Sequence, residues 1–226
     1  MDQTIVEDII KKVMDQMGAS EAAPATSTAQ KATCDESIPV ELSGRHVHLC
    51  EEDIQELFGA PLNYVKELSQ PGQYLCKERV RLIGPTGVID NVAVLGPARP
   101  KSQVELSLTD ARILGVKAPV RQSGDVAGTP GIVLTSGTGL AGLQEGVIVA
   151  ARHIHMSPAD AAKYGVSDNQ KVHVYMDGER PAVFKDVIVR VHKDFSLAMH
   201  IDFDEANSCG LGKNAKGKIV GVTQEA

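Results

Sequence analysis

The chain has 226 residues, enough for one large domain or two small ones, and its 42% hydrophobic and 23% charged residues are ordinary for a globular protein. The net charge of −6 and the lack of tryptophan argue against a protein that binds nucleic acid through the phosphate backbone or through stacked bases. No apolar run approaches the roughly 20 residues that span a bilayer, and the first residues do not resemble a secretory signal, so no membrane association is expected. The four irregularly spaced cysteines do not suggest a disulfide framework, which favours a reducing compartment.

The first residues are predicted to form a short amphipathic docking helix, residues 1–20. Ile5, Ile9 and Val13 recur at helical spacing, and charged residues of both signs occupy the other side. Residues 21–37 are rich in Ala, Ser and Thr, which predicts a flexible linker. A helix this short is not stable alone in water, so its apolar stripe must pack either on the body of the chain or on a partner surface.

The body of the chain contains an internal repeat. Residues 44–49 (GRHVHL) return as residues 151–156 (ARHIHM), at an offset of 107 residues. Residues 104–111 (VELSLTDA) parallel residues 199–206 (MHIDFDEA), at an offset of 95 residues. In the second pair, apolar and polar residues alternate before a helical stretch, which predicts a strand that leads into a helix.

Each repeat supplies three side chains that can bind a metal ion. Residues i and i+2 of a strand point to the same side, so each His-x-His presents two imidazoles together. Glu105 and His200 occupy equivalent positions and add a third ligand to each half. Imidazole and carboxylate suit zinc, and three protein ligands leave an open position for a substrate. The predicted ligands of two zinc ions are therefore His46, His48, Glu105, His153, His155 and His200.

A positively charged turn precedes the first carboxylate ligand. Arg99 follows Gly96-Pro97 and lies six residues before Glu105, and Lys101 adds a second positive charge. A guanidinium group can hold a phosphate through two parallel hydrogen bonds, so Arg99 is the predicted catalytic residue that binds an oxyanion. The glycine-rich residues 123–142 match neither a P-loop nor a dinucleotide-binding motif, which predicts turns that join the two halves.

Taken together, these motifs resemble those of the PduL-type phosphotransacylases, also called phosphate propanoyltransferases. The resemblance covers nearly all of residues 38–222 and is carried by GRHVHL, LIGPTGVIDNVAVLGPARPKSQVELS, QSGDVAGTPGIVL, ARHIHMSPADA and MHIDFDEANSCGLG. It implies a mainly β fold with short helices (α+β), in which residues 38–125 and 126–226 form a tandem duplicated pair of small β-barrel subdomains with the active site between them. It also implies that a short-chain acyl-CoA, propionyl- or acetyl-CoA, reacts with phosphate to give an acyl phosphate and coenzyme A.

The same resemblance implies further site residues and partners. The family's metal ligands fall on the six residues already named, and its phosphate-binding arginine falls on Arg99. Contacts to coenzyme A or phosphate are expected at Ser43, Lys101 and Asn207. Members that work in bacterial microcompartments carry an N-terminal encapsulation helix and linker, which predicts a location in the microcompartment lumen, shell or core proteins as partners, and a homo-oligomer, a dimer.

Two other functions fit the residues themselves. One is a two-metal zinc hydrolase, in which water replaces phosphate, and the other is a non-catalytic, zinc-stapled scaffold protein of the microcompartment. Structural zinc sites usually have four protein ligands and often use cysteine, which argues against the scaffold. A release of coenzyme A that depends on phosphate would exclude the hydrolase.

Overall fold

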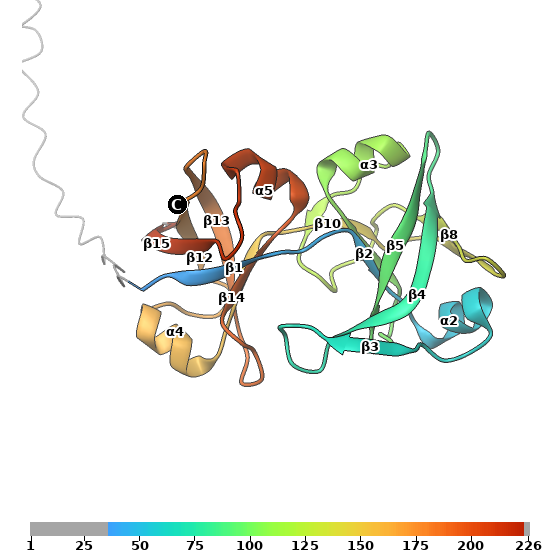
Figure 1. The fold of residues 1–226 in the computed structure, drawn as a ribbon, viewed down its shortest axis with the longest axis horizontal. Helices are drawn as coiled ribbons and strands as arrows, with labels where there is room; N and C mark the ends of the chain where they lie inside the picture. The colour runs from blue at the N-terminus through green and yellow to red at the C-terminus, as the bar shows by residue number, and fades with distance from the viewer. Residues whose placement is uncertain (1–35, 224–226) are drawn as a thin grey trace, which may run out of the picture. The chain divides into compact units, whose positions relative to one another are not determined.

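The structure is a computed structural model that describes residues 36–223 (Figure 1). The predicted docking helix at residues 1–20, and all but the end of the predicted linker, lie outside the described residues and stay predictions. The described residues belong to one compact unit. None of the helices among them is long and apolar enough to cross a membrane.

The described chain is mainly β, with short helices between the strands. It begins with β1 (Ile38–Leu42), β2 (His46–His48), α2 (Glu51–Phe58), β3 (Tyr64–Glu67), β4 (Tyr74–Ile83), β5 (Val88–Gly96), β6 (Gln103–Leu106), α3 (Leu108–Leu114) and β7 (Val120–Arg121). It continues with β8 (Ile132–Thr135), β9 (Leu140–Leu143), β10 (Val147–Ala150), β11 (His153–Met156), α4 (Pro158–Tyr164), β12 (Lys171–Met176), β13 (Ala182–Val191), β14 (Ala198–Ile201), α5 (Phe203–Cys209) and β15 (Lys216–Val222).

The strands form two sheets of related topology. One is a closed barrel in the order β1-β14-β11-β13-β12-β15, and the other has the order β7-β10-β6-β2-β5-β4-β8-β9, with β3 paired to β4. The nine-stranded sheet holds most of the first half and is called the first sheet; in it β2 is antiparallel to β6 and parallel to β5. In the barrel, β11 is antiparallel to β14 and parallel to β13. The predicted fold class, a mainly β protein built from a duplicated pair of barrel-like sheets, is confirmed.

The sheets do not divide the chain at the predicted boundary between residues 125 and 126. Strands β8 and β10 pair with β4 and β6, so the first sheet extends to Ala150. Strand β1 pairs instead with β14 and β15, so it closes the barrel of the second half before β2 enters the other sheet (Figure 1). A sequence repeat identifies equivalent residues, but the exchange of a strand between halves depends on hydrogen bonds between distant segments, which the repeat does not specify.

Each sheet encloses its own hydrophobic core, and the cores orient the His-x-His motifs. Val47 and Ile154, the middle residues of the two motifs, have no exposed surface and lie in the two separate cores. Side chains alternate across a strand, so burial of the middle residue turns both flanking histidines to the opposite face. Burying one such aliphatic side chain contributes about 1.5–3 kcal/mol, which makes a shift of register by one residue costly.

Short capped helices end the two strands that carry the third ligands. Ser107 and Asp110 form a reciprocal capping box at the start of α3, and Asp202 and Glu205 form the same motif at the start of α5. Each N-cap lies two residues after its ligand, Glu105 or His200. The caps therefore fix where both ligand strands end, which holds the third ligand beside its histidine pair.

Candidate functional site

A cavity of about 600 Å³ lies between the two sheets. Its lining includes all six predicted metal ligands and the predicted oxyanion-binding residue Arg99. Both halves of the duplication contribute, because the two His-x-His strands face this cavity from different sheets. The structure thus brings together side chains that are up to 154 residues apart in the sequence.

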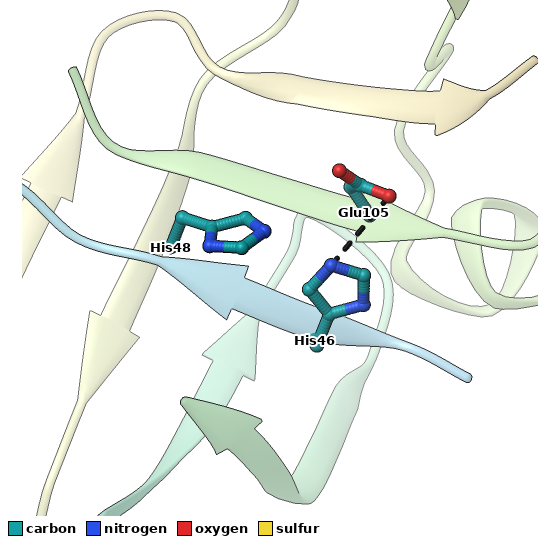
Figure 2. A group of neighbouring side chains, drawn as sticks. All are labelled: His46, His48 and Glu105. Atoms are coloured by element: carbon teal, nitrogen blue, oxygen red, sulfur yellow. Dashed lines mark ion pairs between the residues drawn. The ribbon is translucent and has the colours of Figure 1, made fainter. Parts of the chain in front are cut away.

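The first cluster consists of His46 and His48 on β2 and Glu105 on the neighbouring strand β6 (Figure 2). One ligand atom from each residue lies within 4.8 Å of the others, and all three side chains are buried. His46 and Glu105 are register partners, and the distance from His46 Nε2 to Glu105 Oε2 is 3.5 Å. Three buried donors at this separation can surround a single ion.

The hydrogen bonds of His46 direct one ring nitrogen to Glu105. Its Nδ1 lies 2.8 Å from the carbonyl oxygen of Gly44 and donates to it, which leaves Nε2 facing the carboxylate. Burial lowers the pKa of His46, but the charge of Glu105 and its hydrogen bond raise it more, so the pKa lies above its ordinary value. Burial raises the pKa of Glu105, but the charge and the hydrogen bond of His46 lower it by more, so the pKa lies well below its usual range. Both shifts have one cause, because the imidazolium and the carboxylate each stabilise the charged form of the other.

The second cluster consists of His153 and His155 on β11 and His200 on β14. The ring centroids are 4.7 Å apart for His153 and His155, 5.3 Å for His153 and His200, and 4.9 Å for His155 and His200. His153 Nδ1 lies 2.8 Å from the carbonyl oxygen of Ala151, which repeats the contact of His46 with Gly44. Such a contact fixes the tautomer and leaves Nε2 available as a ligand.

Four of the histidines are held neutral. Burial is the main cause that lowers the pKa of His48 and of His155 to about 2, and of His200 to about 3, with further lowering by the charge of neighbouring histidines. Burial also lowers the pKa of His153. A neutral imidazole offers a lone pair, which is the form that binds a metal ion.

Three buried ring nitrogens have no hydrogen-bond partner within the described part of the chain: Nδ1 of His173, which does not line the cavity, and two that occupy equivalent positions in the repeat. The equivalent two are Nδ1 of His48 and Nδ1 of His155. Buried polar atoms are nearly always satisfied in native proteins, so an unsatisfied pair at equivalent positions indicates missing partners. A divalent cation would supply such a partner, and the donor set of His46, His48 and Glu105, whose ligand atoms lie within 4.8 Å of one another, fits zinc.

Sequence reasoning missed the two residues that support Glu105. Its Oε1 accepts hydrogen bonds from Gln103 Nε2 at 2.6 Å and from Ser123 Oγ at 2.8 Å, so Oε2 is the oxygen left facing His46. Gln103 precedes Glu105 by two residues on the same strand, so strand alternation would have placed it on the same face. Ser123 lies in the glycine-rich stretch that was predicted only to form turns, and no sequence signal pointed to it.

Three arginines line the cavity: Arg99, Arg190, and Arg45, which forms an ion pair with Asp110. Arg99, the predicted one, is partly buried and its Nη1 donates to Ser123 Oγ at 3.1 Å. Burial and the charge of Arg190 lower the pKa of Arg99 while Glu105 raises it, and a guanidinium group stays charged in proteins. Arg190 on β13 is the register partner of His155 and was not predicted. The offset of 95 residues aligns it with Leu95, the register partner of His48, so the first half offers no equivalent arginine that could have pointed to it.

The residues expected to contact coenzyme A are not all at this cavity. Ser43 lines it, whereas Asn207 lines a separate cavity of about 560 Å³ beside α5. Lys101 lines neither of the two cavities, and its Nζ donates to Glu145 Oε1 at 2.9 Å.

The fold and site define a duplicated β-barrel protein with a buried cluster of metal-capable side chains and three cavity arginines. The profile of the phosphate propanoyltransferase family matches residues 39–212. A phosphate propanoyltransferase of Listeria monocytogenes is 53% identical over 197 residues, which cover 86% of this chain and 92% of that protein. One of Enterococcus faecalis is 49% identical over 218 residues (96% and 95%), and one of Thermotoga maritima is 54% identical over 177 residues (77% and 84%). The chain belongs to the phosphate propanoyltransferase family and is an acyltransferase.

Proposed function

We propose that this enzyme transfers a short-chain acyl group, propionyl or acetyl, between coenzyme A and inorganic phosphate by means of a two-zinc site. The observation that carries the proposal is one cavity whose lining includes all six predicted metal ligands together with Arg99 and Arg190. The similarity to relatives named phosphate propanoyltransferase supports the same reaction.

The six ligands would hold two zinc ions. His46, His48 and Glu105 would hold one, and the three histidines of the second half, His153, His155 and His200, would hold the other. Support comes from the unsatisfied Nδ1 atoms of His48 and His155 and from the neutral state of the buried imidazoles. When bound, zinc supplies Lewis-acid polarisation of the thioester and charge neutralisation at the sulfur of coenzyme A.

Arg99 and Arg190 would bind and orient the phosphate. Phosphate is already an anion at neutral pH, so the nucleophile needs positioning more than it needs a general base. One phosphate oxygen attacks the thioester carbonyl carbon, the C–O bond forms, and the C–S bond breaks as coenzyme A leaves with the electron pair. Positive charge fixed in the cavity stabilises the oxyanion of this step. Leu95 and Phe195, which also line the cavity, would accept the apolar acyl chain.

Contacts and partners beyond the cavity belong to the same proposal. Ser43 lies where it could contact the reacting end of coenzyme A, while Lys101 and Asn207 lie away from the cavity and would serve only distant parts of that molecule. A homodimer, a location in the microcompartment lumen, and docking of residues 1–20 on shell or core proteins rest on the resemblance of the N-terminal sequence to encapsulation helices.

The test is the release of coenzyme A from propionyl-CoA, followed with a thiol reagent at increasing phosphate concentrations. We expect a rate that saturates with phosphate, persists with arsenate, and is lost after chelation and restored by zinc. A release of coenzyme A that does not depend on phosphate would favour the two-metal hydrolase. A zinc-loaded chain that releases no coenzyme A from either acyl-CoA would favour the scaffold.

A further inference from the structure

The hydroxyl group of Ser123 connects the cavity arginine to the carboxylate of the first cluster. Its Oγ donates to Glu105 Oε1 at 2.8 Å and accepts from Arg99 Nη1 at 3.1 Å and from Gln103 Nε2 at 2.9 Å. Glu105 Oε1 is the acceptor in both of its contacts, from Ser123 Oγ and from Gln103 Nε2. A serine hydroxyl has one hydrogen and two lone pairs, so these three contacts use its full capacity.

The loop that carries Ser123 is held against the strand of Glu105. The Gln103 side chain donates through Nε2 to Ser123 Oγ and to Glu105 Oε1, and its Oε1 accepts from the backbone N–H of Gly124 at 2.7 Å. Gly124 has φ +100°, a conformation that side chains with a Cβ rarely adopt. The hydroxyl is therefore positioned by a buried amide rather than by a freely moving loop.

We infer that Ser123 is a positioning residue that couples the phosphate-binding arginine to the metal-binding carboxylate. The inference rests on the proposed function. With Gln103, Ser123 occupies Glu105 Oε1 and so keeps Oε2 turned to His46. With its remaining lone pair it holds the Arg99 guanidinium beside the same cluster. Loss of this one hydroxyl should disturb the anion site and the metal site together.

The arrangement belongs to the first half alone. Gln103 is the register partner of His48, and the residue that pairs with His155 in the same way is Ala198, which has no amide to offer. Loss of the Ser123 hydroxyl should therefore lower the zinc affinity of the first cluster and leave the zinc affinity of the second cluster unchanged. This half-site effect is not expected from a general loss of stability.

The experiment compares Ser123→Val with Ser123→Thr in the full chain. Valine and threonine have nearly the same shape, and only threonine carries a hydroxyl group. The comparison therefore separates the effect of the hydrogen bonds from that of the added volume. Ser196→Ala is the control, because Gln70 contacts the backbone of Ser196 and not its hydroxyl. Zinc affinity is measured by competition with a chromophoric chelator, and the KM for phosphate by release of coenzyme A.

We expect Ser123→Val to lower the affinity for one of the two zinc ions about 10- to 100-fold, as the loss of a hydrogen bond to a metal ligand typically does. It should also raise the KM for phosphate about tenfold. Ser123→Thr should restore both values to within about threefold, and Ser196→Ala should change neither. Arg99→Ala should raise the KM for phosphate with little effect on zinc, and the double variant Arg99→Ala, Ser123→Val should have a KM no higher than that of Arg99→Ala, since the shared contact is lost only once.

Full additivity of the two changes in KM would overturn the inference, and so would a Ser123→Val chain that binds zinc and phosphate as the Ser123→Thr chain does. An equal loss of affinity for both zinc ions in the Ser123→Val chain would also overturn the inference. The wild-type chain tests the proposed function separately: if its release of coenzyme A does not depend on phosphate, the proposed function fails, whatever the variants show.

Discussion

Replacement of Arg190 by leucine tests the cavity residue that the sequence did not reveal. Leucine is the natural choice, because Leu95 holds the equivalent position in the first half. Within residues 36–223 no carboxylate forms an ion pair with Arg190, and its guanidinium carbon lies 5.9 Å from the centroid of the Phe195 ring. The positive charge is thus not neutralised by the protein, which leaves it available to an anionic substrate.

The expected magnitude follows from these contacts. A hydrogen bond to a charged group contributes about 1.5–3 kcal/mol, and about 1.4 kcal/mol corresponds to a factor of ten in rate. Arg190→Leu should therefore lower kcat/KM for phosphate about 10- to 100-fold. The stability of the fold should hardly change, because the variant loses only a weak cation–π contact and also removes the repulsion between Arg190 and Arg99.

The assay is the initial rate of release of coenzyme A as a function of phosphate, with zinc content and the thermal unfolding midpoint measured on the same preparations. Arg180→Leu is the matched control, since Arg180 is exposed, does not line the cavity, and forms its hydrogen bond to Cys209 through the backbone. An Arg190→Leu enzyme with the same kcat/KM for phosphate as Arg180→Leu would refute the assignment of Arg190 to the anion site.

Four further predictions concern the metal, the tail, the fold and pH. Replacing His153 with Ala should lower the zinc content by about one ion per chain and keep the β circular dichroism; elemental analysis that finds the full content would contradict its role as a ligand. Deleting residues 1–20 should leave the kinetics unchanged but abolish co-localisation with microcompartments, and the targeting role fails if these residues do not direct a fluorescent protein there. Deleting residues 1–42 should prevent cooperative folding, because β1 closes the barrel; a denaturant transition like that of the full chain would contradict this. In the zinc-free chain, unfolding should become easier as the pH falls below 6.5, because the pKa values of His48 and His155 are about 2 in the folded state against 6.5 in the unfolded state, so the unfolded state binds more protons. Each of the two should lower the free energy of unfolding by about 1 kcal/mol between pH 6.5 and 5.5, and equal free energies at these two pH values would contradict the prediction.

The ligand clusters show how far local sequence patterns reach. Strand periodicity correctly predicts that the two histidines of each motif share a face, and the structure buries Val47 and Ile154 on the opposite one. The offset between Glu105 and His200 correctly predicts equivalent strands, each paired with its histidine strand. These features depend on residues a few positions apart or on a repeated segment, and both are visible in one sequence.

The supporting residues could not be found in the same way. Ser123 touches Glu105 across 18 residues of chain, and the intervening turn does not reveal where its hydroxyl points. Arg190 lies in an alternating strand, where an arginine is more often a solvated surface residue than a cavity residue. Asn207 follows His200 closely in sequence, yet it faces a different cavity, because α5 turns it away from the strand.

The sequence by itself determined the duplication, the mainly β character, the face of each His-x-His strand and the six side chains gathered around the cavity, because hydrophobic alternation and repetition are local properties of the chain. Only the tertiary structure decided that β1 completes the second barrel, that the first sheet continues through β10, and that Ser123 lies between Arg99 and Glu105. These depend on backbone and side-chain hydrogen bonds between segments far apart in sequence, and such pairings are selected by the packing of the whole fold.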